Sequence, residues 1–132
     1  MKYLFMLIVL SISMPSNATN TRELYEGCNQ AKFWHDAKSP TVTLSKAGKK
    51  CIYYMQGFDA GMVASAINSC SEFNCKAENN PYALHCGVKY GATTYDHISA
   101  FVSWVGNNPK VMEMPVHLVI GLALNSKFPC DA

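Results

Sequence analysis

Six cysteines are the residues with the most distinctive chemistry in this sequence, and all of them follow residue 18. An even number of cysteines in a small exported chain indicates disulfides rather than metal or redox chemistry. A structural zinc site is not expected, because no C-x-x-C pair occurs. We therefore predict disulfides and neither a metal nor a cofactor; the cysteines are Cys28, Cys51, Cys70, Cys75, Cys86 and Cys130.

The remaining titratable residues do not form a catalytic set. His85 precedes Cys86, but adjacent loop residues rarely meet as base and nucleophile, and an oxidised cysteine has no thiolate to offer. The other histidines, His35, His97 and His117, lie on separate elements without metal-ligand spacing, and we expect them on helix surfaces or in the core. Asp59 is expected to be solvated or paired with a lysine. With no nucleotide or hydrolase motif present, the sequence predicts a protein without enzymatic activity.

Residues 1–18 have the features of a cleavable secretory signal peptide. Lys2 supplies the positive end, an apolar run follows, and Ser16 and Ala18 place small residues at a cleavage site. The alternative, an uncleaved membrane anchor, is disfavoured because the apolar run is short. Removal of Lys2 lowers the formal net charge from +2 to about +1, which indicates neither a nucleic-acid partner nor membrane binding after signal cleavage. We predict one domain over residues 19–132.

The stretch CIYYMQGFDAGMVASAIN, residues 51–68, predicts a helix against which the rest of the chain packs. It is apolar around most of its circumference, which is typical of a helix surrounded by neighbours. Gly57 and Gly61 cost such a helix about 2 kcal/mol of propensity together, so we expect them to allow close backbone packing.

Helical spacing elsewhere predicts three more helices. The first spans Thr21 to about Trp34, and a loop from His35 to Leu44 leads to Ser45, which can cap the central helix. The third begins near Thr93 or Thr94 and ends at the sequence GNNP, 106–109. The fourth runs over 116–127 after Pro115. The fold class is all-α, a small disulfide-stapled four-helix domain, with a hairpin and two further helices around a central helix.

The first disulfide follows from the hairpin. Cys28 and Cys51 each lie about one turn from the connecting loop, at the same level of two antiparallel helices, so we expect them to pair. Residues 70–92 break the helical pattern and predict a long loop that contains three cysteines. Connectivity among the other four cysteines stays open at this point.

The order of these features resembles the Rap/Tai family of periplasmic immunity proteins. The resemblance runs from about Leu24 to Cys130 and is carried by LYEGCNQA, CIYYMQGFDAG, CGVKYGATTYDHISAFVSWV, NNPKVMEMP and LALNSKFPC. It implies a non-enzymatic homodimer in the periplasm. Its partner would be a peptidoglycan amidase effector delivered by type VI secretion, and a loop of the immunity protein would enter the catalytic groove of that toxin.

Two departures from the family pattern concern the segment before Cys86. This segment is longer than usual and contains an additional pair, Cys70 and Cys75, while Gly87-Val88 replaces the expected x-Pro after Cys86. The resemblance implies that Cys86 pairs with Cys130, which leaves Cys70 with Cys75. The rival pairing joins Cys70 to Cys130 and Cys75 to Cys86.

Besides an immunity protein, the sequence allows a periplasmic stress or chaperone-like helical protein, and a hydrolase or lysozyme-inhibitor-type module. Two polar connections are candidates for contact with a protein partner, because exposed loops on a rigid scaffold commonly carry recognition. The two connections are residues 70–86 and residues 106–113. The first is longer and is slightly preferred, since a second disulfide would preorganise it. The candidate residues are Glu72, Phe73, Lys76 and Tyr82 in that segment, together with Asn107, Asn108 and Lys110 in the later connection.

Overall fold

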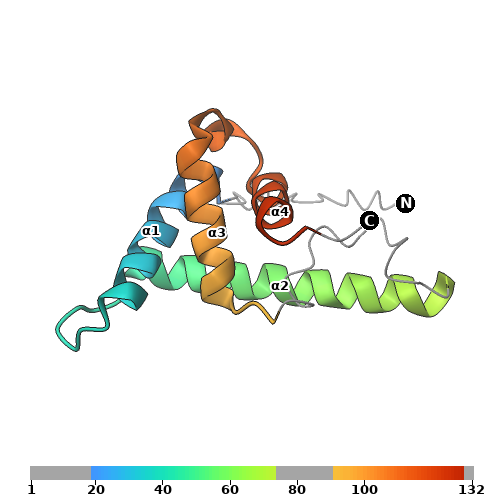
Figure 1. The fold of residues 1–132 in the computed structure, drawn as a ribbon, viewed down its shortest axis with the longest axis horizontal. Coiled ribbons are helices and arrows are strands. Elements are labelled where there is room, and N and C mark those ends of the chain that lie inside the picture. The colour runs from blue at the N-terminus through green and yellow to red at the C-terminus, as the bar shows by residue number, and fades with distance from the viewer. Residues whose placement is uncertain (1–18, 74–90, 130–132) are drawn as a thin grey trace, which may run out of the picture.

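The computed structural model describes residues 19–73 and 91–129, with the backbone alone for 65–73. Its α-helices are α1 (Thr21–Ala37), α2 (Lys46–Phe73), α3 (Thr94–Asn107) and α4 (Val116–Lys127), with a 3-10 helix, η2 (Pro109–Glu113), between the last two. No strand occurs within these ranges. The predicted all-α fold with four helices is therefore confirmed. Figure 1 shows α1 and α2 joined as a hairpin, with α3 rising from α2 towards η2.

Helix starts follow the polar caps in the sequence. The side chain of Asn20 accepts from the Glu23 amide at 2.7 Å, and Ser45 Oγ accepts from the Gly48 amide at 3.0 Å. At α3, Thr93 and Asp96 cap each other reciprocally. The Thr93 amide and hydroxyl donate to the Asp96 carboxylate, which lowers the pKa of that carboxyl below its usual range.

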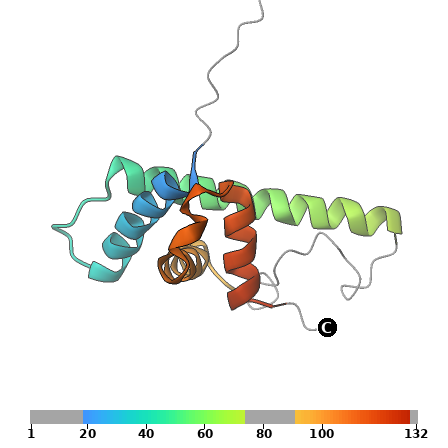
Figure 2. The same cartoon turned by 90° about the horizontal axis from the view of Figure 1, so that it is seen from above.

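Two helix ends differ from the predictions. α1 continues through Ala37 rather than ending near Trp34, because Lys32 pairs with Asp36 and the His35 ring stacks on Tyr95 at a centroid distance of 4.0 Å. Lys38, in the left-handed conformation at φ 48°, then ends the helix. α2 continues through Phe73, so residues 70–73 are helical rather than part of the predicted loop. In Figures 1 and 2, the later half of α2 extends past α4.

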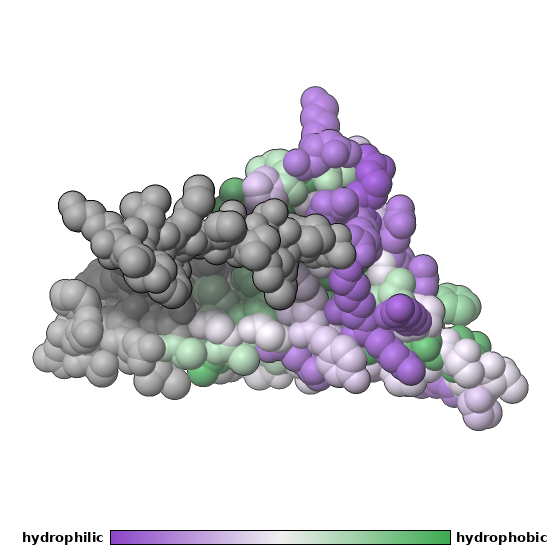
Figure 3. Space-filling model, turned by 180° about the vertical axis from the view of Figure 1, so that it is seen from behind, coloured by the Kyte–Doolittle hydropathy of each residue, from purple (hydrophilic) through white to green (hydrophobic). Residues whose placement is uncertain are grey.

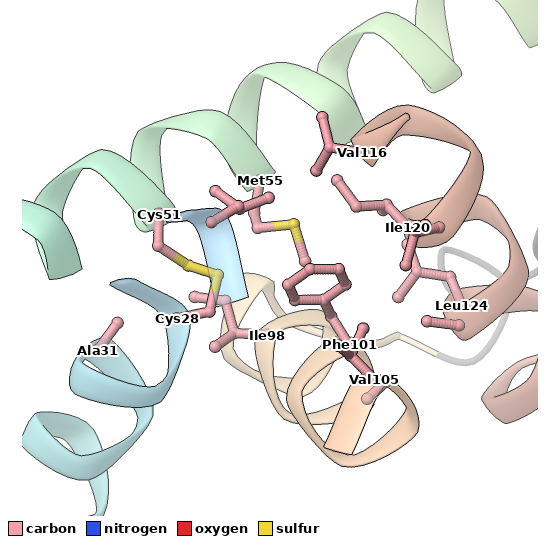
Figure 4. Packing of buried hydrophobic residues seen from close by; sticks show 14 residues of the cluster. Cys28, Ala31, Cys51, Met55, Ile98, Phe101, Val105, Val116, Ile120 and Leu124 are labelled. Carbon is pink, nitrogen blue, oxygen red and sulfur yellow. A yellow bond between two sulfur atoms is a disulfide. The ribbon is translucent and has the colours of Figure 1, made fainter. Parts of the chain in front are cut away.

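The core lies between all four helices, and both α1 and α3 contact every other helix. Phe101 is fully buried, and Figure 4 shows its ring next to Met55 of α2, facing Ile120 of α4. The most deeply buried side chains also include Leu24, Ile98, Val105, Val119 and Leu124.

The described part of α2 is buried on one face only. Met55 is fully buried, but Tyr53 is 69% exposed and Ala60, Val63 and Ala64 are also exposed. The prediction that this helix is surrounded on most sides is therefore wrong for these residues. In Figure 3, seen from behind, green, white and purple residues are mixed along the coloured part of the lower edge, where α2 lies.

The predicted packing role of Gly57 and Gly61 is also wrong. A Cβ atom added at either position would meet no atom of the described residues within 4 Å. Close approach occurs instead at Gly27 and Gly48, where α1 crosses the start of α2. A Cβ on Gly27 would lie 2.6 Å from the Ala47 carbonyl oxygen, so this site admits glycine alone without a shift of backbone.

The predicted bridge between Cys28 and Cys51 is present. Its Cα atoms are 5.2 Å apart, within the range that a disulfide spans, and both residues are fully buried. The bond therefore joins α1 to α2 inside the core. Both pairings proposed for Cys70, Cys75, Cys86 and Cys130 lie outside the described side chains.

Candidate functional site: the turn between α3 and α4

The connection from Gly106 to Glu113, here called the α3–α4 turn, forms the end of the molecule farthest from α2 in Figure 1. Asn107 is the last residue of α3, Asn108 follows as its cap, and Lys110 lies in η2. Their side chains are all exposed. The structure thus brings together the three residues of this connection that the sequence singled out.

Hydrogen bonds hold the backbone of the turn in place. The Asn108 amide donates to the Val105 carbonyl at 3.0 Å, and the Asn108 carbonyl accepts from Val111 at 3.0 Å. The Asn108 side chain donates to the Trp104 carbonyl at 2.8 Å. This side chain closes the helix end, while those of Asn107 and Lys110 make no hydrogen bond or ion pair with other described residues. Asn107 and Lys110 are therefore the two side chains of the set available to a partner.

Contacts with α1 fix the far end of the turn. Thr21 Oγ1 donates to the Met114 carbonyl at 2.6 Å, and Arg22 pairs with Glu113 at 2.6 Å. The Glu113 carboxylate raises the pKa of the Arg22 guanidinium above its ordinary value through a hydrogen bond and the opposite charge. This ion pair contributes little to stability, since both side chains are exposed. Fully buried Thr21 is the firmer of the two anchors.

Asn107 also borders a groove of about 530 Å³ along α3. Hydroxyl, amide, carboxylate and ammonium groups line the groove together with a larger apolar surface, which includes half-buried Trp104. Such a mixture suits a protein interface in which hydrogen bonds surround an aromatic anchor. Its lining residues from α3 are Asp96, Ser99, Ala100, Ser103, Trp104 and Asn107, and those from other elements are Lys32, Ala123, Ser126, Lys127 and Phe128.

The second predicted contact segment is only partly within the structure. Glu72 and Phe73 belong to the last turn of α2, so they extend a helix rather than begin a loop. Their side chains lie outside the described part, as do Lys76 and Tyr82. The two candidate segments are therefore not shown to meet, and the preference for the longer segment stays a prediction.

The sequence did not reveal a buried pair between α2 and α3. His97 Nδ1 lies 2.9 Å from both carboxylate oxygens of Asp59, which corrects the expectation that Asp59 is solvated or paired with a lysine. His97 is 2% exposed, and its ring meets Phe128 edge-on at 5.4 Å. The pair thus joins the middle of α2, the start of α3 and the end of α4. No spacing rule connects two residues 38 positions apart, so no signal in the sequence predicted it.

The described residues form neither a metal site nor a helix that could span a membrane. Among residues 19–73 and 91–129, no three His, Cys, Asp or Glu residues are grouped to hold a metal ion. The helices in the same ranges include none that is long and apolar enough to cross a bilayer.

Comparison with known proteins bears on the whole chain. No curated protein and no solved structure matches it with statistical significance. The family model of the Rap1a immunity proteins matches residues 20–130, which include every described helix and the α3–α4 turn. This protein therefore belongs to the Rap1a immunity protein family.

Proposed function

We propose that this immunity protein acts in the periplasm, where it binds a peptidoglycan amidase delivered by type VI secretion and blocks its active site. Membership of the immunity family implies a cognate effector protein as the partner. The amidase, the secretion route and the periplasm are the finer parts of the proposal. They are supported by the sequence resemblance and by the signal-like residues 1–18. The buried Cys28–Cys51 disulfide supports an oxidising compartment.

The α3–α4 turn is the part of the surface that best fits a wedge into a catalytic groove. It is exposed, its backbone is held by hydrogen bonds at both ends, and Asn107 and Lys110 remain available. A turn that is already ordered loses little conformational entropy on binding. Amide and ammonium groups make hydrogen bonds with water, and in a polar groove they can exchange these for hydrogen bonds with the walls of the groove. The ordered, exposed turn is the observation that carries the proposal.

Asn107→Ala with Lys110→Ala is expected to weaken binding of the cognate amidase at least about tenfold, or about 1.4 kcal/mol. Isothermal calorimetry with the cognate amidase would measure the change. The matched control is Asn125→Ala with Lys38→Ala, which removes the same groups from exposed positions outside the turn. Equal affinities of the two double variants would contradict a role for the turn. A third variant, Phe73→Ala with Tyr82→Ala, tests the longer segment, and retention of affinity in all variants would assign the contact to a helix face.

We further propose a homodimer, as the resemblance implies. An exposed apolar stripe supports it, formed by Leu118 and Leu122 of α4 and by Met114 just before this helix, which are 50%, 48% and 38% exposed. Such a stripe is unfavourable in water unless another surface covers it. Sedimentation at tens of micromolar should give about twice the monomer mass, and Leu118→Glu with Leu122→Glu should give a monomer. A wild-type protein that sediments strictly as a monomer would contradict the dimer.

A further inference from the structure

A second groove, here called the α1–α2 groove, lies between the start of α1 and the first turns of α2. Its volume is about 970 Å³. The floor includes Leu24 and the disulfide residue Cys51, which are 2% and 0% exposed. The groove shares no residue with the α3–α4 turn. Its other lining residues are Glu23, Lys46, Ala47, Lys49, Lys50, Tyr53 and Tyr54.

The rim of this groove is cationic. Lys46, Lys49 and Lys50 are exposed and lie within the first five residues of α2. Lys50 pairs with Glu23 at 2.5 Å, and Glu23 is the one acidic residue among the described lining residues. Neither Lys46 nor Lys49 has an ion pair with another described residue. Two positive charges at the rim are thus uncompensated within the described chain.

These lysines lie at the amino-terminal end of α2, where positive charges are electrostatically unfavourable. The amino-terminal turn of a helix carries a partial positive charge, which favours acidic residues and disfavours lysines. α2 has no acidic residue in its first turn, in contrast to α1 and α3, which have Glu23 and Asp96 there. The mature chain is nearly neutral, so this local excess does not reflect its overall composition. Local conflicts of this kind are expected at functional sites, where a ligand relieves them.

Two tyrosines add an aromatic wall next to the cations. Tyr53 is 69% exposed, while Tyr54 is partly buried, and this burial raises the pKa of its phenol. The Tyr54 hydroxyl therefore stays protonated at neutral pH and can donate a hydrogen bond to an anion. Exposed tyrosines are common anchors in protein interfaces, where they bury much area at a low entropic cost.

We propose that the α1–α2 groove binds an acidic polypeptide segment. Carboxylates of the segment would pair with Lys46 and Lys49, while an apolar side chain would lie against Tyr53 above the floor. The concave shape favours a polypeptide over an anionic membrane, since a bilayer surface does not reach into a groove. This inference goes beyond the proposed function, because it concerns a different surface and does not depend on the nature of the effector.

The test uses the isotope-labelled mature protein and a short peptide that alternates glutamate with phenylalanine. Its amide resonance shifts are expected to cluster at Lys46, Lys49, Tyr53 and Tyr54. Lys46→Gln with Lys49→Gln should weaken peptide binding at least about tenfold at low salt, as two lost charge contacts imply. The matched control is Lys38→Gln with Lys127→Gln, which changes the net charge equally at exposed positions outside the groove.

Several results would overturn the proposal. The first is equal weakening of peptide binding by both double variants. The second is equal binding of a peptide that alternates lysine with phenylalanine. The third is a cluster of amide resonance shifts elsewhere on the surface. Displacement of the acidic peptide by phosphatidylglycerol vesicles would instead assign the cations to a membrane. Removal of lysines from the start of α2 should not lower the melting temperature. Should the double variant fold poorly, Tyr53→Ala alone provides the same test, because this side chain is mostly exposed.

Discussion

Replacement of Cys28 and Cys51 with alanine is expected to lower the free energy of unfolding by about 3 kcal/mol. The bond joins residues 23 positions apart, so its loss frees a loop of this length in the unfolded chain. For a domain of this size, 3 kcal/mol corresponds to a fall in melting temperature on the order of 15 °C. Both cysteines are fully buried, so loss of their sulfur atoms adds a packing defect to the entropic effect.

Thermal unfolding followed by far-ultraviolet dichroism would measure this difference. The double variant keeps the other four cysteines, so it isolates the bridge between α1 and α2 from the rest. Reduction of the wild-type protein should lower the melting temperature by at least as much. A double variant that melts within about 3 °C of the wild type would show that packing alone holds the hairpin.

Gly27→Ala is expected to destabilise the protein by about 1 to 3 kcal/mol, because the new methyl group overlaps a backbone atom. The added Cβ would lie 2.6 Å from the Ala47 carbonyl oxygen and 3.1 Å from its carbon. Backbone cannot rotate away as a side chain can, so α1 and α2 must separate. The disulfide, one residue along at Cys28, opposes that separation.

Gly57→Ala is the matched control, since it makes the same chemical change inside α2. No atom of the described part of the chain lies within 4 Å of its added Cβ, so the change should stabilise the protein by up to about 1 kcal/mol through helix propensity. Denaturant unfolding of both variants would measure the two effects. The two substitutions are expected to change the free energy of unfolding in opposite directions. An undiminished stability of Gly27→Ala would contradict the described contact between α1 and α2, and a destabilised Gly57→Ala would contradict the open space described around Gly57.

Much of the fold could be predicted because its signals are local. Ser45 and Thr93 cap helices where their hydroxyls precede helical spacing, and Pro109 follows the end of α3. The Cys28–Cys51 pair followed from two helices of a hairpin at the same level. Local rules do not state which neighbour covers which face. For this reason the sequence suggested Gly57 and Gly61 for close packing, whereas the helices cross at Gly27 and Gly48.

In the candidate site, too, local sequence signals predicted some features, while others depend on tertiary packing. The α3–α4 turn was predictable, because glycine, asparagine and proline together indicate a connection between helices. Its rigidity was not, because Thr21 reaches the Met114 carbonyl from 93 residues away. Asp59 and His97 also meet only through the packing of α2 against α3. The end of α2 was missed because serine, asparagine and glutamate suggested a loop over residues 70–92, although the helix continues through Phe73.

The central claim is that this immunity protein inhibits a peptidoglycan amidase, and an inhibition assay tests it most directly. The proposed cognate amidase would be incubated with purified peptidoglycan and increasing amounts of this protein, and released fragments would be quantified. We expect cleavage to stop near one immunity chain per amidase, and the Asn107→Ala, Lys110→Ala variant to require at least about tenfold more protein. Undiminished cleavage in the presence of a large excess of folded, disulfide-bonded protein would contradict the claim.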